Sequence, residues 1–127
     1  MTDELLKMIP GANEVSAWFG KWPAFHDAEI TQLQLHQGAV ITFTVYAWNM
    51  TSEVDEKGYY RNEKYADVDF RLGGVSAINL ADLTETGVLF ELSIERADKQ
   101  LMLVMGSSYG VHGTIAFVSC SVKLNPR

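Results

Sequence analysis

The residues that could do chemistry in this sequence are concentrated in one short run, Trp22-Pro23-Ala24-Phe25-His26-Asp27. A histidine beside a carboxylate is typical of general bases and of metal ligands. The expected geometry opposes a dyad, because neighbouring side chains of an extended segment point to opposite sides. We therefore expect His26 to fill a half-buried site and Asp27 to accept backbone N–H bonds, with a catalytic role as the open alternative.

Metal and thiol chemistry find little support in the composition. His36 and His112 are the other two of the three histidines, and no Cys-x-x-Cys or His-x-x-x-His spacing occurs. We predict no metal and no cofactor. The single cysteine, Cys120, lies in an apolar strand pattern, which predicts a buried structural thiol and no internal disulfide.

An acidic run followed by tyrosines and an arginine is the second candidate site: Glu53, Asp55, Glu56, Tyr59, Tyr60 and Arg61. The run lacks the glycine and terminal glutamate of an EF-hand calcium loop. Tyrosine and arginine beside acidic residues are typical of the rim of a protein-binding site. The same residues would equally suit the base of a loop that packs on the sheet, and the sequence leaves both readings open.

Length and charge limit the classes of function. The 127 residues predict one domain spanning 1–127, and 47% apolar with 20% charged residues is ordinary globular usage. The net charge of −6 disfavours nucleic-acid and anionic-membrane binding. It suits a basic partner, or simply keeps the protein soluble. An acidic N-terminus without a long apolar run predicts a cytoplasmic protein.

Helical signals occupy residues 1–20 of the sequence. Thr2 or Asp3 is a plausible cap for a first short helix, which the Pro10-Gly11 turn ends. Asn13 is the expected N-cap of a second helix, which Gly20 stops in the left-handed conformation. Such short helices are unstable alone, so we expect the face of Val15, Trp18 and Phe19 to dock on the rest of the domain.

From residue 28 to residue 124 the apolar pattern changes to period two, which predicts strands. Strands 28–36 and 39–48 form the expected hairpin, with a bulge near Thr31 and with Tyr46 and Trp48 either exposed or facing a second sheet. The alternation predicts that Leu89 faces solvent and that Val118 faces the core. Further strands are expected near 65–72, 75–83, 88–95, 101–105 and 114–124, with loops at 49–63 and 106–113.

This pattern predicts a mostly β fold of about seven strands. The connections include no helical crossover, so the strands should pair antiparallel. We expect a curved sheet or β-sandwich with the short N-terminal helix packed on it.

Residues 9–29 contain three distinctive motifs: Ile9-Pro10-Gly11-Ala12, Trp18-Phe19-Gly20, and Trp22-Pro23-Ala24-Phe25-His26-Asp27 before an alternating strand. With these motifs the chain resembles the family called Immunity protein 50, and the looser resemblance extends over most of the chain. It implies a mostly β protein of a bacterial polymorphic-toxin system that binds and blocks a cognate toxin domain without catalysis. Trp22, Pro23, Phe25, His26 and Asp27 match the family pattern, as contacts with the toxin or as supports of the fold.

Three functions therefore stand as hypotheses. The first is a non-enzymatic immunity protein, and the acidic charge favours a basic, nuclease-like toxin as its partner. The second is a small-ligand-binding or hydrolytic β domain that uses His26 and Asp27. The third is a structural or adaptor β domain that associates through an exposed edge strand. The sequence does not decide the oligomeric state.

Overall fold

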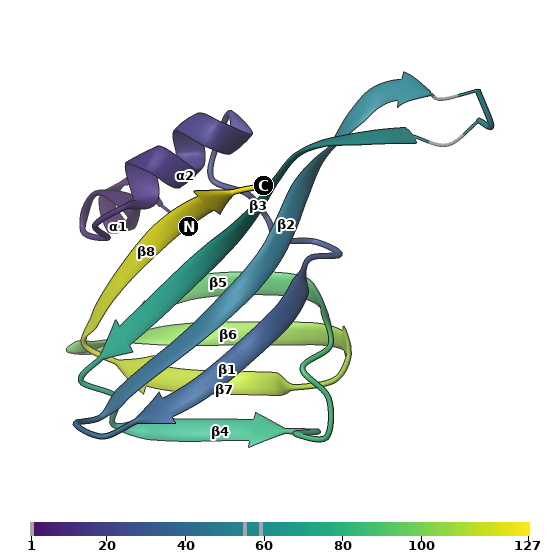
Figure 1. Cartoon of the computed structure of the whole chain (residues 1–127). Coiled ribbons are helices and arrows are strands. Elements are labelled where there is room, and N and C mark those ends of the chain that lie inside the picture. The colour runs from purple at the N-terminus through teal and green to yellow at the C-terminus, as the bar shows by residue number, and fades with distance from the viewer. Residues whose placement is uncertain (1, 55, 59) are drawn as a thin grey trace.

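In the computed structural model, which describes residues 2–54, 56–58 and 60–127, the chain forms one antiparallel sheet of eight strands and two short helices (Figure 1). Side chains are described for all of these residues except 50–54 and 60–62. The elements are α1 (Asp3–Lys7), α2 (Ala12–Phe19), β1 (Glu29–His36), β2 (Val40–Val54), β3 (Tyr60–Gly73), β4 (Ala77–Ala81), β5 (Val88–Ala97), β6 (Gln100–Tyr109), β7 (His112–Phe117) and β8 (Ser119–Pro126). The predicted mostly β, antiparallel fold class is confirmed.

The sheet bends back on itself between β1 and β5. Its strands follow the order β4-β7-β6-β5-β1-β2-β3-β8, and the pairing of β1 with β5 is confined to Glu29 and Val88 in the described chain. At this weak seam the half made of β1, β2, β3 and β8 crosses over the half made of β4 to β7 (Figure 1). The inner faces of the two halves therefore enclose the core.

The core is one connected cluster drawn from both halves. Phe43 and Phe70 stack at 4.6 Å between ring centroids, and the other half contributes Leu103, Ile115 and Phe117 to the same cluster. Each of these side chains is at most 1% exposed, which is what the period-two pattern predicts for inward positions. Burial of this apolar surface is the main force that holds the two halves together.

Helix α2 docks on the edge strand β8, and α1 packs against α2. Thr2 caps α1 by accepting a hydrogen bond from the Leu5 amide, as expected. The predicted N-cap Asn13 is wrong: α2 begins after Gly11, whose φ of 88° places it in the left-handed region. Gly11 lies against the carbonyl of Val122, and the Val122 amide donates to Pro10 O at 2.9 Å. This contact with β8 decides where the helix begins.

The helix end and its buried face agree with the prediction. Gly20 ends α2 in the left-handed conformation, and Val15 and Phe19 are buried while Trp18 is half-buried against the core. Neither of the helices in the described chain is long and apolar enough to cross a membrane.

The predicted loop at 49–63 is wrong, because β2 continues to Val54 and β3 begins at Tyr60. Together these strand ends form a two-stranded ribbon that projects beyond the rest of the sheet (Figure 1). The sequence of this segment is polar and lacks the alternation that marks a half-buried strand, so its pattern did not predict the two strands. The predicted hairpin of β1 and β2 and the bulge between Ile30 and Gln32 are confirmed.

The last third of the chain departs from the prediction in three places. The expected loop at 106–113 is wrong, because β6 runs to Tyr109 and β7 begins at His112. The expected strand 114–124 is two strands, and Val118 at the break is 60% exposed where an inward side chain was predicted. Leu89 is fully buried, because register shifts between Val88 and Glu91 reverse the parity at the start of β5, while Leu92 and Ile94 keep the predicted inward positions.

Candidate functional site

The segment between α2 and β1 is anchored by its aromatic residues. Trp22 and Phe25 meet edge to face at 5.7 Å, and both rings contact Phe70, at 6.3 and 5.8 Å. Phe25 is only 3% exposed. For these two motif residues the packing supports a structural role, since their rings close one end of the core.

His26 and Asp27 form an exposed pair, which corrects the expectation from sequence. The His26 Nδ1 atom lies 3.2 Å from Asp27 Oδ2, and the two side chains are 67% and 54% exposed. The segment is not extended here, because Phe25 and Asp27 have φ values of 58° and 67° and the chain turns between them. Hydrogen bonds from Asp27 N to Leu89 O and from Ala28 N to Phe25 O hold this turn.

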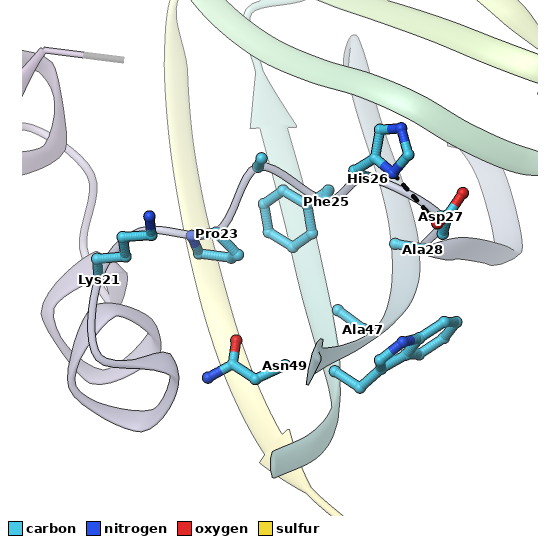
Figure 2. A pocket seen from close by; sticks show the side chains of 10 residues that line it. Lys21, Pro23, Phe25, His26, Asp27, Ala28, Ala47 and Asn49 are labelled. Atoms are coloured by element: carbon cyan, nitrogen blue, oxygen red, sulfur yellow. Dashed lines mark ion pairs between the residues drawn. The ribbon is translucent and has the colours of Figure 1, made fainter. Parts of the chain in front are cut away.

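A hollow of about 280 Å³ opens between this segment and residues 47–49 of β2 (Figure 2). His26 and Asp27 lie at one end of it and Lys21 lies at the other. Most of the lining is apolar or aromatic: Lys21, Pro23, Ala24, Phe25, His26, Asp27, Ala28, Ala47, Trp48 and Asn49. The lining contains no hydroxyl or thiol beside the histidine, so the polar groups that it offers are those of Lys21, His26, Asp27, Trp48 and Asn49.

Three aromatic rings gather on the outer face of the sheet beside this hollow. Tyr46 lies 5.3 Å from Trp48 and 6.0 Å from Tyr65, and Trp48 lies 6.2 Å from Tyr65. The neighbours Val45 and Ala47 are buried, so the rings point away from the core. This decides between the two readings of Tyr46 and Trp48: they do not face a second sheet. We call Tyr46, Trp48 and Tyr65 the aromatic face.

Trp48 belongs both to the aromatic face and to the lining of the hollow. The two features therefore form one continuous surface, which carries aromatic rings on one side and the His26–Asp27 pair on the other.

A charged pair borders the aromatic face. Arg127 donates two hydrogen bonds to Asp67, at 3.2 Å from Nε and 2.8 Å from Nη2. Its guanidinium carbon also lies 4.0 Å from the centre of the Tyr46 ring. The hydrogen bond to Asp67 raises the pKa of Arg127 further above its ordinary value. An arginine held between an aromatic ring and a carboxylate is thus already present on this surface.

Helix α2 fixes the foot of the ribbon. The Trp18 indole donates to Lys64 O at 3.0 Å, and Asn49 donates to Phe19 O at 2.8 Å. Ala47 and Asn49 pair with Ala66 and Glu63, so β3 has one more residue than β2 here. Lys64, at φ 59°, lies in this bulge. The foot of the ribbon is therefore held in place independently of its tip.

The second candidate set from the sequence lies on the ribbon itself. The backbones of Glu53, Tyr60 and Arg61 lie in its two strands, and Glu56 is exposed in the turn. Asp55 and Tyr59 lie outside the described residues. The structure thus brings the ribbon and the aromatic face onto the same strand pair, β2 and β3.

Sequence reasoning missed Tyr65, Asp67 and Arg127 as parts of this surface. The signal for Tyr65 and Asp67 was present, because both have the same outward parity on their strand as Tyr46 and Trp48 have on theirs. Arg127 carried no such signal, since only the pairing of β3 with β8 brings it beside Asp67.

The remaining reactive groups do not assemble into a metal or thiol centre. Across the described residues, no three His, Cys, Asp or Glu side chains gather as a metal ion would require. Cys120 is buried, and burial raises the pKa of its thiol to about 12, so it is a poor nucleophile at neutral pH.

Comparison with known proteins adds no relative. No family model, no curated protein and no solved structure matches this chain. The resemblance of residues 9–29 to the Immunity protein 50 family therefore stays a prediction, and the functional argument depends on the surface described above.

Proposed function

We propose that this protein is a cytoplasmic immunity protein that binds a cognate toxin domain and blocks it without catalysis. The aromatic face and the ribbon beside it are the proposed binding surface. The resemblance of residues 9–29 supports the biological role, and the geometry of the surface supports binding of another protein.

The observation that carries the proposal is the outward cluster of Tyr46, Trp48 and Tyr65, with rings 5.3 to 6.2 Å apart. Tyrosine, tryptophan and arginine are the residues that most often dominate the binding energy of protein interfaces. Such side chains contribute most when they are rigid before binding, because less conformational entropy is lost. These three are held by paired strands whose foot is tied to α2.

The projecting ribbon extends the proposed binding surface. Extending from β2 and β3, its backbone reaches beyond the body of the domain (Figure 1). A surface of this shape is suited to lie across an active site while the aromatic face packs beside it. The net charge of −6 would speed association with a basic toxin domain, such as one that grips nucleic acid.

The test is a binding measurement with the toxin domain encoded next to this protein. Calorimetry with the wild-type chain should give a complex, and Trp48→Ala should weaken it by at least about thirtyfold, since anchors of this type cost about 2 kcal/mol or more. Phe90→Ala is the matched control, because Phe90 is an aromatic side chain that is 50% exposed on β5. Equal affinities of the Trp48→Ala and wild-type chains would rule out this surface.

A second candidate function is suggested by the convergence of His26 and Asp27 on the hollow. A small-ligand-binding or hydrolytic domain would use such a pair as a polar anchor or general base. The volume of about 280 Å³ lies near the lower end of small-molecule pockets, which usually enclose roughly 300 to 1,000 Å³, so the ligand of such a domain would be small. Thermal-shift screening with a metabolite library, repeated with His26→Ala, tests it; the absence of any shift that depends on His26 would exclude this candidate.

A further inference from the structure

We infer that the hollow between residues 21–28 and residues 47–49 of β2 receives an arginine side chain from the bound protein. This inference rests on the proposed function, and it names the chemistry of the partner at one point of the surface. The guanidinium would stack on Trp48 and form hydrogen bonds with Asp27, while its aliphatic stem would lie on the apolar lining.

The first argument is size and lining. The hollow has a volume of about 280 Å³, which is enough for one long side chain and lies near the lower end of pockets that enclose small molecules. Apolar atoms supply most of its wall, with Phe25 and Ala47 among the lining residues and Trp48 beside them. A long side chain with an apolar stem and a polar head matches such a wall better than a fully polar ligand does.

The second argument is charge. Asp27 carries an exposed carboxylate at one end of the hollow, and Glu29, also exposed, is paired in register with Tyr46 nearby. His26 contacts one oxygen of Asp27, but a carboxylate has about four acceptor positions and therefore keeps capacity for a guanidinium. Lys21 lies at the opposite end of the hollow, away from Asp27 (Figure 2).

The third argument is an example within the same surface. Arg127 donates two hydrogen bonds to Asp67 and stacks on Tyr46. One guanidinium thus contacts both an aromatic ring and a carboxylate. Trp48 and Asp27 supply the same two partners at the hollow. Arginine is preferred over lysine for this arrangement, because its planar fork bonds a carboxylate in two places and stacks on rings.

The experiment begins with the full-length protein and a small probe. Titration with N-acetyl-arginine-N-methylamide at millimolar concentration should shift the amide signals of Ala28 and Ala47 and the indole signal of Trp48, and the shifts should saturate. The matched probe N-acetyl-citrulline-N-methylamide has nearly the same shape without the charge, and it should leave these signals in place. Absence of saturable shifts with the arginine probe, or equal shifts with both probes, overturns the inference.

Asp27→Asn is the matching variant, and it should abolish the saturable shifts without unfolding the protein. Its control is Asp82→Asn, since Asp82 also has a positive φ, 57° against 67° for Asp27, and also pairs with a histidine, His112 at 3.4 Å. Asparagine tolerates the left-handed conformation, so both variants keep the backbone. Persistence of the shifts in Asp27→Asn would contradict the inference.

Binding experiments with the toxin domain distinguish failure of this inference from failure of the proposed function. Asp27→Asn should weaken its binding about tenfold, and a double-mutant cycle should couple Asp27 to one arginine of the toxin. If the arginine probe binds and no toxin does, the proposed function fails while the chemistry of the hollow stands. If the toxin binds through Trp48 while the probe gives no shift, the inference fails and the proposed function stands.

Discussion

The ring of Phe25 packs edge-on against Phe70, with 5.8 Å between the two ring centroids and an interplanar angle of 69°. Phe70 belongs to the strand β3 that also carries Tyr65 on its outer side. The contact therefore ties the segment that carries His26 and Asp27 to the strand pair that carries the aromatic face. Its loss should affect both the stability of the fold and the shape of the hollow.

Replacing Phe25 tests this anchor directly. Phe25→Ala should lower the free energy of unfolding by about 3 to 5 kcal/mol, because it removes a buried aromatic side chain and leaves a cavity. Phe90→Ala, at an aromatic residue that is 50% exposed, should cost about 1 kcal/mol or less. Urea unfolding followed by fluorescence measures both. Similar losses in the two variants would mean that Phe25 does not anchor the segment.

His26 should contribute little to the stability of the fold. Its side chain is 67% exposed, and exposed pairs such as His26 with Asp27 add little. His26→Ala should therefore change the free energy of unfolding by less than about 0.5 kcal/mol at pH 7. A loss above about 2 kcal/mol in urea unfolding would instead support a buried, structural histidine.

Gly11 and Gly20 provide a matched pair at the two ends of α2. Both have left-handed φ values, 88° and 86°, but a Cβ at Gly11 would collide with the Val122 backbone while one at Gly20 would meet open space. Gly20→Ala should cost about 1 to 2 kcal/mol for the backbone conformation alone. Gly11→Ala should cost about 1 to 3 kcal/mol more, because it also forces α2 away from β8.

Unfolding experiments on the two glycine variants measure this difference, and the near-ultraviolet dichroism of Trp18 and Trp22 reports any shift of the helix. Equal stabilities of the two variants would show that α2 does not depend on close contact with β8.

The thiol of Cys120 should make stability depend on alkaline pH. Burial raises its pKa in the folded protein to about 12 from an ordinary value of 9.0, so the folded state keeps the proton longer than the unfolded state does. The stability that the protonated thiol contributes is complete below pH 9. It is lost as pH rises toward 12, and the free energy of unfolding falls by up to about 1.4 kcal/mol per pH unit.

Comparison of the wild-type chain with Cys120→Ala isolates the thiol from the tyrosines and lysines that titrate in the same range. The free energy of unfolding should fall more steeply with pH in the wild-type chain between pH 9 and 12. Parallel pH profiles of the two proteins would show that burial does not suppress ionisation of this thiol.

Prediction from the sequence succeeded where burial alternates along a strand. The hairpin of β1 and β2 and the inward set Ala66, Val68, Phe70 and Leu72 of β3 follow from this alternation. It failed at 49–63 and 106–113, where the strands are stabilised by their neighbours and not by an apolar face of their own. It also failed at Val118, because the apolar pattern continues unbroken across the point where the chain passes from β7 to β8.

The candidate site was predicted in part. The residues of the motif were identified, but an extended backbone was assumed for His26 and Asp27. The left-handed conformations of Phe25 and Asp27 are unusual for residues other than glycine, and the packing of Phe25 against Trp22 and Phe70 supports them. The residue types that form this turn do not by themselves predict its conformation.

The sequence by itself determined that this protein is mostly β, which side chains of most strands point inward, and where α2 ends. These properties depend on residues close together in the chain, through side-chain alternation and helix capping. The tertiary structure decided which outward residues meet: Trp48 with Tyr65, Arg127 with Asp67, and Asp27 with the hollow that Trp48 also lines. These contacts join distant positions, so they exist only once strand pairing and the bend of the sheet have brought the strands together.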